Sequence, residues 1–318
     1  MKILKIVGGI VALLVVLVAG VAAWVAATFD PEKYKPELVA LVKEKTGRTL
    51  SIDGKLGVSF FPTLGVSAAG VKLSEPGSDK RFASVAEARV SLALMPLLSR
   101  EVVVDRVVLA GLNADVVRGR DGHLNIDDLT GGADDKGGKD AKDKAPADKS
   151  AAPSMKLDIA GVEIRAEHLG WRDEQAGANW KVSALTLKTG RISDGAQGKL
   201  EFAARIDGTQ PKVGVNANMT AGYRVNFSSQ SFALTGLAAK VEGDAPGAAG
   251  LSANLKGDIE ADGGKGSLKV AGLNLVAKTR DGIDATVNLP LLSISEKGAD
   301  ASGLDAVIKI IRGALSLD

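Results

Sequence analysis

Strict alternation of apolar and polar residues over residues 213–227 constrains the fold of this chain more than any other feature. Eight apolar side chains stand at every second position, and the residues between them are small or polar. Successive side chains of a β-strand point to opposite faces of a sheet, so this period of two predicts an extended strand, or a bent pair, with one apolar face. That face consists of Val213, Val215, Ala217, Met219, Ala221, Tyr223, Val225 and Phe227.

The same pattern recurs at 200–206, 251–255 and 283–289, and the whole of 155–318 is punctuated by glycine. Asp-Gly pairs favour hairpin turns; they stand at Asp53, Asp121, Asp194, Asp207, Asp262 and Asp281. Aromatic content of 4% and 38 glycines suit a thin sheet better than a thick core. The chain is therefore predicted to be mainly β, with an antiparallel, twisted and elongated sheet.

An apolar sheet face must be covered by something. A second sheet would make a closed sandwich, a helix would make an α+β layer, and acyl chains would make the face a groove. Alternation does not separate these three possibilities, so the sheet is predicted to be either groove-like or a sandwich.

An uncharged run of 24 residues, Ile6 to Phe29, precedes the β-rich part and contains Leu14, Val18 and Trp24. A bilayer core needs roughly 20 apolar residues, so the run predicts a transmembrane helix, with Trp24 and Phe29 near its far end. A cleaved signal peptide is the alternative, with a mature N-terminus near Ala23 or Ala27. The run exceeds the usual 7–15 residues of a signal peptide, which favours an uncleaved anchor.

Lys2 and Lys5 lie before this run, which predicts a cytoplasmic N-terminus and a single-pass topology with the bulk of the chain on the other side. A short amphipathic helix is predicted over residues 31–46, capped by Asp30 and ended by Gly47. Tyr34, Leu38, Leu41 and Val42 form its apolar stripe. That stripe either lies on the membrane surface or packs on the first β-hairpin.

Residues 131–154 contain Gly, Ala, Asp, Lys, Pro and Ser and no large apolar side chain. Such a segment buries too little surface to offset its ordering entropy, which predicts a disordered linker. The predicted organisation is a cytoplasmic tip and anchor at 1–29, a helix and β region at 30–130, the linker at 131–154, and a second β-rich region at 155–318.

Motifs of catalysis are missing from this sequence. It contains no Cys, no Gly-rich phosphate loop, no Gly-x-Ser-x-Gly and no His-Glu-x-x-His, and a net charge of +2 argues against a nucleic-acid surface. His123 follows Asp121-Gly122 in a segment whose oxygen ligands do not match a Ca²⁺ loop, so a hairpin turn is preferred. His168, near Trp171, is predicted to be an exposed residue at a strand end. We therefore expect no enzymatic activity, no metal and no cofactor.

The first 130 residues resemble the AsmA family of Gram-negative envelope proteins. The resemblance rests on the order of short segments, each weak alone, over about 100 residues. These are Asp30-Pro31, Tyr34-Lys35-Pro36, Thr46-Gly47-Arg48, Phe60-Phe61-Pro62-Thr63-Leu64, Gly70-Val71-Lys72-Leu73, Leu94-Met95-Pro96-Leu97-Leu98, Leu109-Ala110-Gly111 and Asp121-Gly122 with Asn125 and Leu129. Residues 155–318 resemble the family only in general character, because they are β-rich, alternate apolar and polar residues and contain frequent glycines.

The resemblance implies an inner-membrane protein with a periplasmic β-rich body that supports outer-membrane assembly and lipid homeostasis. Larger members look like bridge proteins whose curved sheets carry phospholipid acyl chains. On this basis the eight alternating residues 213–227 are the candidate lipid-facing wall, and membrane phospholipids are the expected partner, with envelope protein partners not identified. The alternative is a periplasmic scaffold protein with a closed β-sandwich core and no lipid cargo. The chain is short for the family, and it is interpreted as complete or as a fragment of a longer protein.

Overall fold

The computed structural model describes residues 30–60, 63–94, 96, 103–130, 158–296 and 298–310. The predicted membrane span, with Ile6, Leu14, Val18, Trp24 and Phe29, lies outside these residues, and so does the predicted linker 131–154. Among the described residues no helix is long and apolar enough to cross a membrane. The anchor therefore stays a prediction from the sequence.

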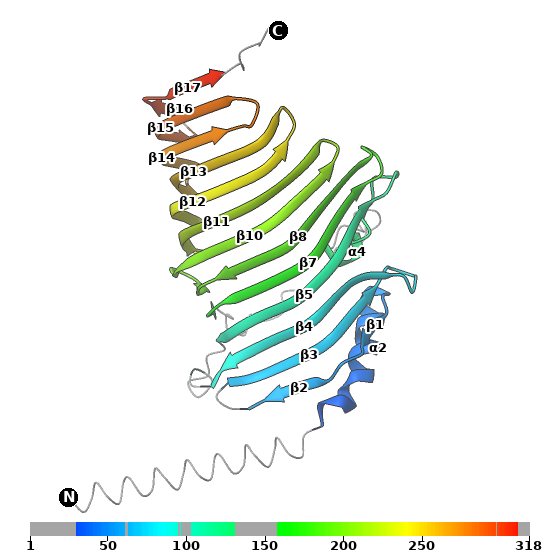
Figure 1. The fold of residues 1–318 in the computed structure, drawn as a ribbon. Helices are drawn as coiled ribbons and strands as arrows, with labels where there is room; N and C mark the ends of the chain where they lie inside the picture. The colour runs from blue at the N-terminus through cyan, green and yellow to red at the C-terminus, as the bar shows by residue number, and fades with distance from the viewer. Residues whose placement is uncertain are drawn as a thin grey trace, which may run out of the picture.

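All 17 strands of the described residues belong to one sheet, which is long and curved (Figure 1). The N-terminal strands are β1 (Leu50–Ile52), β2 (Leu56–Ser59), β3 (Thr63–Ser74), β4 (Arg81–Ala93) and β5 (Val104–Arg118). The middle strands are β6 (Asp158–Ile159), β7 (Val162–Asp173), β8 (Ala178–Thr189), β9 (Ile192–Ser193), β10 (Gln197–Thr209) and β11 (Lys212–Asn226). The C-terminal strands are β12 (Ser231–Ala245), β13 (Ala248–Asp262), β14 (Ser267–Lys278), β15 (Ile283–Ser295), β16 (Gly298–Ser302) and β17 (Asp305–Ile310).

Neighbouring long strands are also neighbours in the chain, as in a meander, and their pairs are antiparallel with one exception. β5 pairs in parallel with β7, and with β6 through Val104 and Ile159. The sheet is therefore mixed, and the prediction of a purely antiparallel sheet was wrong at this point. Val104, at the N-terminal end of β5, pairs with Ile159 of β6, so the chain returns to that end of β5 and β7 runs the same way as β5. Alternation is identical in the two orientations and does not reveal this return.

The sheet is a single layer along its described length. Apart from the contacts of β1 with α2 and of β2 with η1, the described strands pack chiefly on their neighbours within the sheet. The closed β-sandwich that the sequence left open is thus not what these residues form. Figure 1 shows the long strands bending together, so that the layer curves into a trough.

Bulges and skipped pairs in several strands accompany this bend. Gly70, Gly111, Gly236 and Gly272, in β3, β5, β12 and β14, all have φ between +59° and +65°. The pairing register shifts or skips a residue at each of these positions. A bulge bends its strand and increases the local twist, so a line of bulges curves the whole layer.

Gly111 and Gly236 allow a matched test of this arrangement. A Cβ added at Gly111 would lie 2.6 Å from the Cβ of Ala86, whereas one added at Gly236 would meet nothing within 4 Å. Both residues have left-handed backbone, so alanine brings similar strain at either position. We expect Gly111→Ala to lose about 1–3 kcal/mol more stability than Gly236→Ala, because only the first also overpacks. Chemical unfolding of the two variants measures this difference; equal losses would contradict the role assigned to the contact with Ala86.

Five of the six predicted Asp-Gly turns lie at or next to turns between strands, and the sixth prediction was wrong. Asp207 and Gly208 lie inside β10, because the turn to β11 falls at Gln210-Pro211. Gly208 has a packing role there, since a Cβ at this position would lie 2.9 Å from the ring of Trp180.

The predicted helix forms, in two parts. Residues Pro31–Tyr34 make a 3₁₀ turn, η1, and Lys35–Thr46 make the α-helix α2. Asp30 caps the start by accepting a hydrogen bond of 3.1 Å from the N–H of Glu32, and Gly47 ends the helix with φ of +69°. Both caps were predicted. A further short helix, α4 (Asp127–Thr130), precedes the undescribed segment.

Arg48 joins these helices to the sheet. Its side chain is fully buried, and its Nε and Nη2 donate to the two carboxylate oxygens of Asp128 at 2.7 and 2.6 Å. It also donates to the carbonyls of Ser74 and Asn125, and its guanidinium lies 4.7 Å from the ring centre of Phe82. The hydrogen bonds from Arg48 hold the pKa of Asp128 below its ordinary value. Arg48 of the Thr46-Gly47-Arg48 segment therefore connects α2 and α4 to the sheet through these contacts.

Candidate functional site

One face of the sheet carries an unbroken row of apolar residues across thirteen strands, from β2 to β17. Directly paired residues on neighbouring strands point to the same face, so the register alone defines the row. We call it the central row. It consists of Leu56, Ala68, Ala88, Leu109, Ile164, Leu187, Phe202, Met219, Ala239, Leu255, Leu275, Val287 and Ala306.

The length of the central row follows from the spacing of strands. At about 4.8 Å between neighbours, thirteen strands make a row about 58 Å long. The apolar half of a bilayer, one leaflet, is about 15 Å thick. The row is therefore about four times as long as an extended acyl chain in a membrane.

Apolar rows flank the central row on both sides. On one side five valines are paired in order across β2, β3, β4, β5 and β7, namely Val58, Val66, Val90, Val107 and Val162. On the other side a row of small residues runs across the C-terminal half. It contains Ala204, Ala217, Val241, Ala253, Ala277, Ala285 and Ile308. Together with the central row they make a broad apolar strip, which we call the apolar face.

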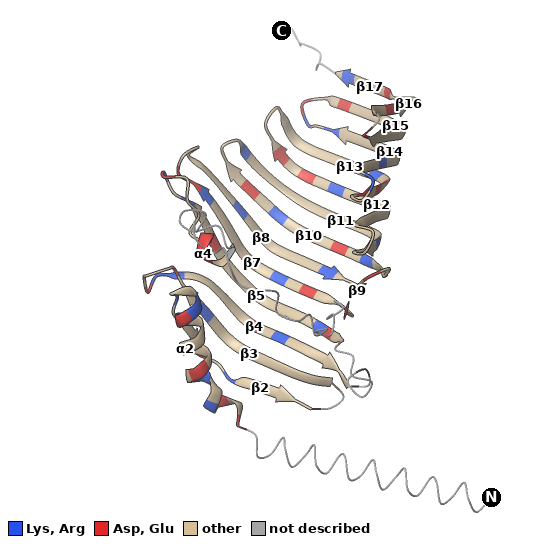
Figure 2. Ribbon diagram, turned by 180° about the vertical axis from the view of Figure 1, so that it is seen from behind, with Lys and Arg blue, Asp and Glu red and all other residues tan. Residues whose placement is uncertain are grey.

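The opposite face has a different chemistry. The row one residue along from the central row is Gly57, Ser67, Arg89, Val108, Glu163, Lys188, Glu201, Thr220, Ala238, Lys256, Asn274, Asn288 and Asp305. It is mostly polar or charged, and charged positions are spread over the whole sheet rather than collected in one region (Figure 2). The sheet therefore has one polar face and one apolar face.

Much of the apolar face is only half-buried. Val66 and Val90 are 55% and 45% exposed, and Phe232, Ile294, Ile308 and Ile310, which lie on the same face, are at least 40% exposed. Contiguous apolar patches of more than a few hundred Å² are unusual on a soluble monomer and mark interaction surfaces. No second layer covers this face among the described strands.

The candidate wall predicted from the sequence lies on this face. All eight residues share one side of β11 or its end, and Met219 belongs to the central row. Val215, Ala221 and Tyr223 are buried, Val213, Ala217, Met219 and Val225 are half-buried, and the intervening Asn216, Asn218, Thr220 and Arg224 are exposed. Phe227 lies just beyond the strand and is 45% exposed. The structure thus brings them together with apolar residues from twelve other strands.

Tyr223 is the one member with a buried polar group. Its hydroxyl donates a hydrogen bond of 2.7 Å to the carbonyl of Arg191, so the ring presents only its apolar part to the face. Burial raises the pKa of this hydroxyl. A satisfied hydroxyl leaves the apolar character of the wall intact.

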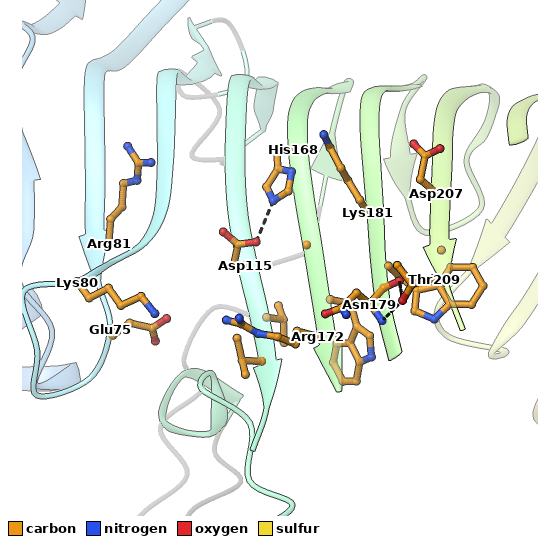
Figure 3. A pocket seen from close by; sticks show the side chains of 16 residues that line it. Glu75, Lys80, Arg81, Asp115, His168, Arg172, Asn179, Lys181, Asp207 and Thr209 are labelled. Carbon is orange, nitrogen blue, oxygen red and sulfur yellow. Dashed lines mark hydrogen bonds and ion pairs between the residues drawn. The ribbon is translucent and has the colours of Figure 1, made fainter. Parts of the chain in front are cut away.

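A hollow of about 590 Å³ lies at the ends of β5, β7, β8 and β10, where Trp171 and Trp180 line it together with charged side chains (Figure 3). His168 Nε2 lies 2.8 Å from Asp115 Oδ1, and this contact passes over Gly170, where a Cβ would lie 2.1 Å from the same oxygen. Lys80, Arg81, Arg172 and Lys181 contribute cations to its lining. His168 was predicted to be an exposed residue at a strand end; its side chain is instead 33% exposed, and it lies within β7 and pairs across strands with Asp115.

Nothing in the described residues gathers three or more His, Asp, Glu or Cys side chains into a metal-binding group. His123 follows a turn at Asp121-Gly122, as predicted, and its side chain is 80% exposed. Its Nδ1 lies 3.2 Å from Asp127 Oδ2. The apolar face is therefore the feature of this structure with the greatest extent and the clearest chemistry.

Sequence comparison identifies relatives of this chain. The profile of the AsmA family matches residues 1–296 of the chain. The protein AsmA of Escherichia coli (strain K12) is 24% identical over 215 residues, which cover 65% of this chain and 32% of that protein. The match thus spans about a third of the length of that relative. No solved structure gives a significant match.

Proposed function

The chain belongs to the AsmA family, and we propose that it shields or hands on phospholipid acyl chains along its apolar face in the Gram-negative envelope. Family membership and homology to AsmA indicate an envelope-associated function. In the proposal the predicted span at 6–29 holds the chain in the inner membrane, with its N-terminus cytoplasmic and its sheet in the periplasm. The role is non-enzymatic support of outer-membrane biogenesis and lipid homeostasis.

The continuity of the central row carries the proposal. An acyl chain that moves from strand to strand meets no polar side chain along thirteen strands. Each apolar Å² that the lipid covers contributes about 25 cal/mol, and the many small side chains leave room close to the backbone. The gain is similar at every strand, which favours movement along the row over tight binding at one place. A similar gain in free energy at every strand is expected of a surface along which a lipid moves.

A scaffold protein without lipid cargo is the second candidate. It would need a partner that covers the apolar face, because the described residues supply no second sheet. Lipid is favoured because the face is long and uniform, whereas protein interfaces concentrate their binding energy in a few central residues.

Photo-crosslinking in cells tests the lipid proposal. A crosslinking amino acid placed at Val213, Met219 or Val225 should capture phospholipid, because these half-buried side chains lie on the apolar face. The matched controls are Asn216, Asn218 and Thr220, which are exposed on the other face of the same strand. We expect at least tenfold more lipid adduct on the first set. Equal lipid yields on the two faces would contradict the proposal, and protein adducts confined to the apolar face would favour the scaffold.

A further inference from the structure

Two leucines of the predicted apolar stripe of α2, Leu38 and Leu41, are exposed, whereas Val42 of the same stripe is partly covered. Leu38 and Leu41 are 40% and 51% exposed, and Tyr34, one turn earlier, is 48% exposed. The residues of the helix that are covered are instead Lys35, Val39, Val42 and Thr46, which point about 100° away from the stripe around the axis. Leu38 and Leu41 therefore do not follow the interpretation in which the stripe packs on the first hairpin, whereas Val42 lies on the covered side of the helix.

The helix is held firmly against the first strands by two polar contacts. Glu32 accepts a hydrogen bond of 2.6 Å from the N–H of Leu56, and Lys35 donates one of 2.6 Å to the carbonyl of Gly54. Glu32 and Lys35 also pair with each other at 2.5 Å, and their hydrogen bonds lower the pKa of Glu32. Leu56 is the first residue of the central row, so the direction of the stripe is fixed relative to that end of the row.

The position of the helix in the chain points to a membrane as the occupant of this stripe. The uncharged run ends at Phe29, and η1 begins two residues later at Pro31. A span that leaves the bilayer at Phe29 places the helix at the headgroup level, because no linker separates them. Glu37, Glu44, Lys33 and Lys45 give the exposed surface both signs of charge, so apolar contact rather than charge would hold it there.

We infer that α2 lies in the surface of a phospholipid bilayer, with Leu38 and Leu41 at the boundary of headgroups and acyl chains, and thereby holds the β2 end of the central row beside the lipids. This inference rests on the proposed membrane location and adds the point at which lipid enters. Because the span already tethers the helix, docking is intramolecular and needs only a small gain in free energy. The central row then starts at the bilayer surface and leads away from it.

Fluorescence quenching in proteoliposomes tests this arrangement in the full-length chain. The protein contains no cysteine, so a single Leu38→Cys, Leu41→Cys or Ala40→Cys variant accepts one bimane label without background. The vesicles contain phosphatidylethanolamine and phosphatidylglycerol with a shallow spin-labelled lipid. Ala40 is exposed and lies 100° from Leu41 around the helix, which makes it the matched control.

We expect the labels at 38 and 41 to be quenched at least threefold more strongly than the label at 40, with little change between low and high salt. Equal quenching at the three positions, or none at 38 and 41, overturns the inference. A crosslinker at Met219 in the same vesicles separates this result from the proposed function. Lipid adducts at Met219 without quenching refute only the docking of α2, and quenching without adducts refutes only the lipid path. Failure of the chain to insert through residues 6–29 overturns both.

Discussion

Replacement of Arg48 by alanine is expected to destabilise the β1–β4 end of the sheet by about 3–5 kcal/mol. The change removes a fully buried guanidinium and leaves the carboxylate of Asp128 and the carbonyls of Ser74 and Asn125 without its hydrogen bonds. Removing one partner of a buried ion pair costs more than the pair contributes, because groups that it satisfied stay desolvated; here the carbonyl of Ser74 is buried, while the side chain of Asp128 is 26% exposed. Lysine should not rescue the loss, since one ammonium cannot reproduce the planar fork.

Amide hydrogen exchange is the appropriate measurement. The long strands of this sheet pack chiefly on their neighbours, so unfolding can be local, and a global midpoint would dilute the effect. Exchange in β1, β3 and β4 should accelerate by roughly two to four orders of magnitude, since 1.4 kcal/mol corresponds to a factor of ten. Exchange in β12 and β13 should stay the same.

Two further variants test whether the buried ion pair causes the loss of stability. Arg89 is exposed on β4 and pairs with Glu87, so Arg89→Ala should change stability by less than about 1 kcal/mol. The double variant Arg48→Met with Asp128→Leu removes both charges and should recover part of the loss. Equal losses of stability in Arg48→Ala and Arg89→Ala would show that Arg48 does not stabilise the β1–β4 end of the sheet.

The same ion pair predicts an acid response. The folded-state pKa of Asp128 is lowered, so its contribution to stability is present above the unfolded value of about 3.9 and is lost as the pH falls through the folded pKa. Exchange in β1–β4, corrected for its intrinsic pH dependence, should therefore accelerate below about pH 4. In Asp128→Asn this acceleration should be smaller, and an unchanged profile would contradict the assignment.

Two carboxylates placed on the apolar face of β11 are expected to block the passage of lipid to the C-terminal half of the sheet. Ala217→Asp with Met219→Asp interrupts the central row and one of its neighbours in the middle of the trough. A carboxylate against acyl chains costs about 2.5–3.5 kcal/mol, which corresponds to a decrease in occupancy of roughly a hundredfold. The matched control is Asn218→Asp with Thr220→Asp, which adds the same charge to the other face of the same strand.

Crosslinkers on either side of the block report the result. Ile164 in β7 lies on the side of the proposed entrance, and Leu275 in β14 lies beyond the substitutions. With the apolar face blocked, lipid adducts at Leu275 should fall at least tenfold while those at Ile164 persist. The control variant should match the parent protein at both positions. Unchanged adducts at Leu275 would show that lipid does not travel along this row.

Much of the sheet could be predicted from local patterns. Alternation over 213–227 indicated both the strand β11 and its apolar face, because the period of two is a property of the chain itself. Asp30 and Gly47 marked the ends of the helix for equally local reasons. The stripe of α2, by contrast, was visible in the sequence but its environment was not, since two helix faces carry apolar residues and only packing selects one.

The sequence by itself determined which residues extend, where most turns fall and which side of each strand is apolar, because these depend on side chains a few positions apart. Only the tertiary structure decided that the apolar sides form one continuous row, that β5 and β7 run in parallel, that no second described sheet closes over the face, and that Arg48 holds the helical end. These features depend on the register between strands and on contacts such as Arg48 with Asp128, 80 residues apart. A shift of one residue in register would turn the apolar residues of a strand to the polar face of the sheet without changing the alternation in its sequence.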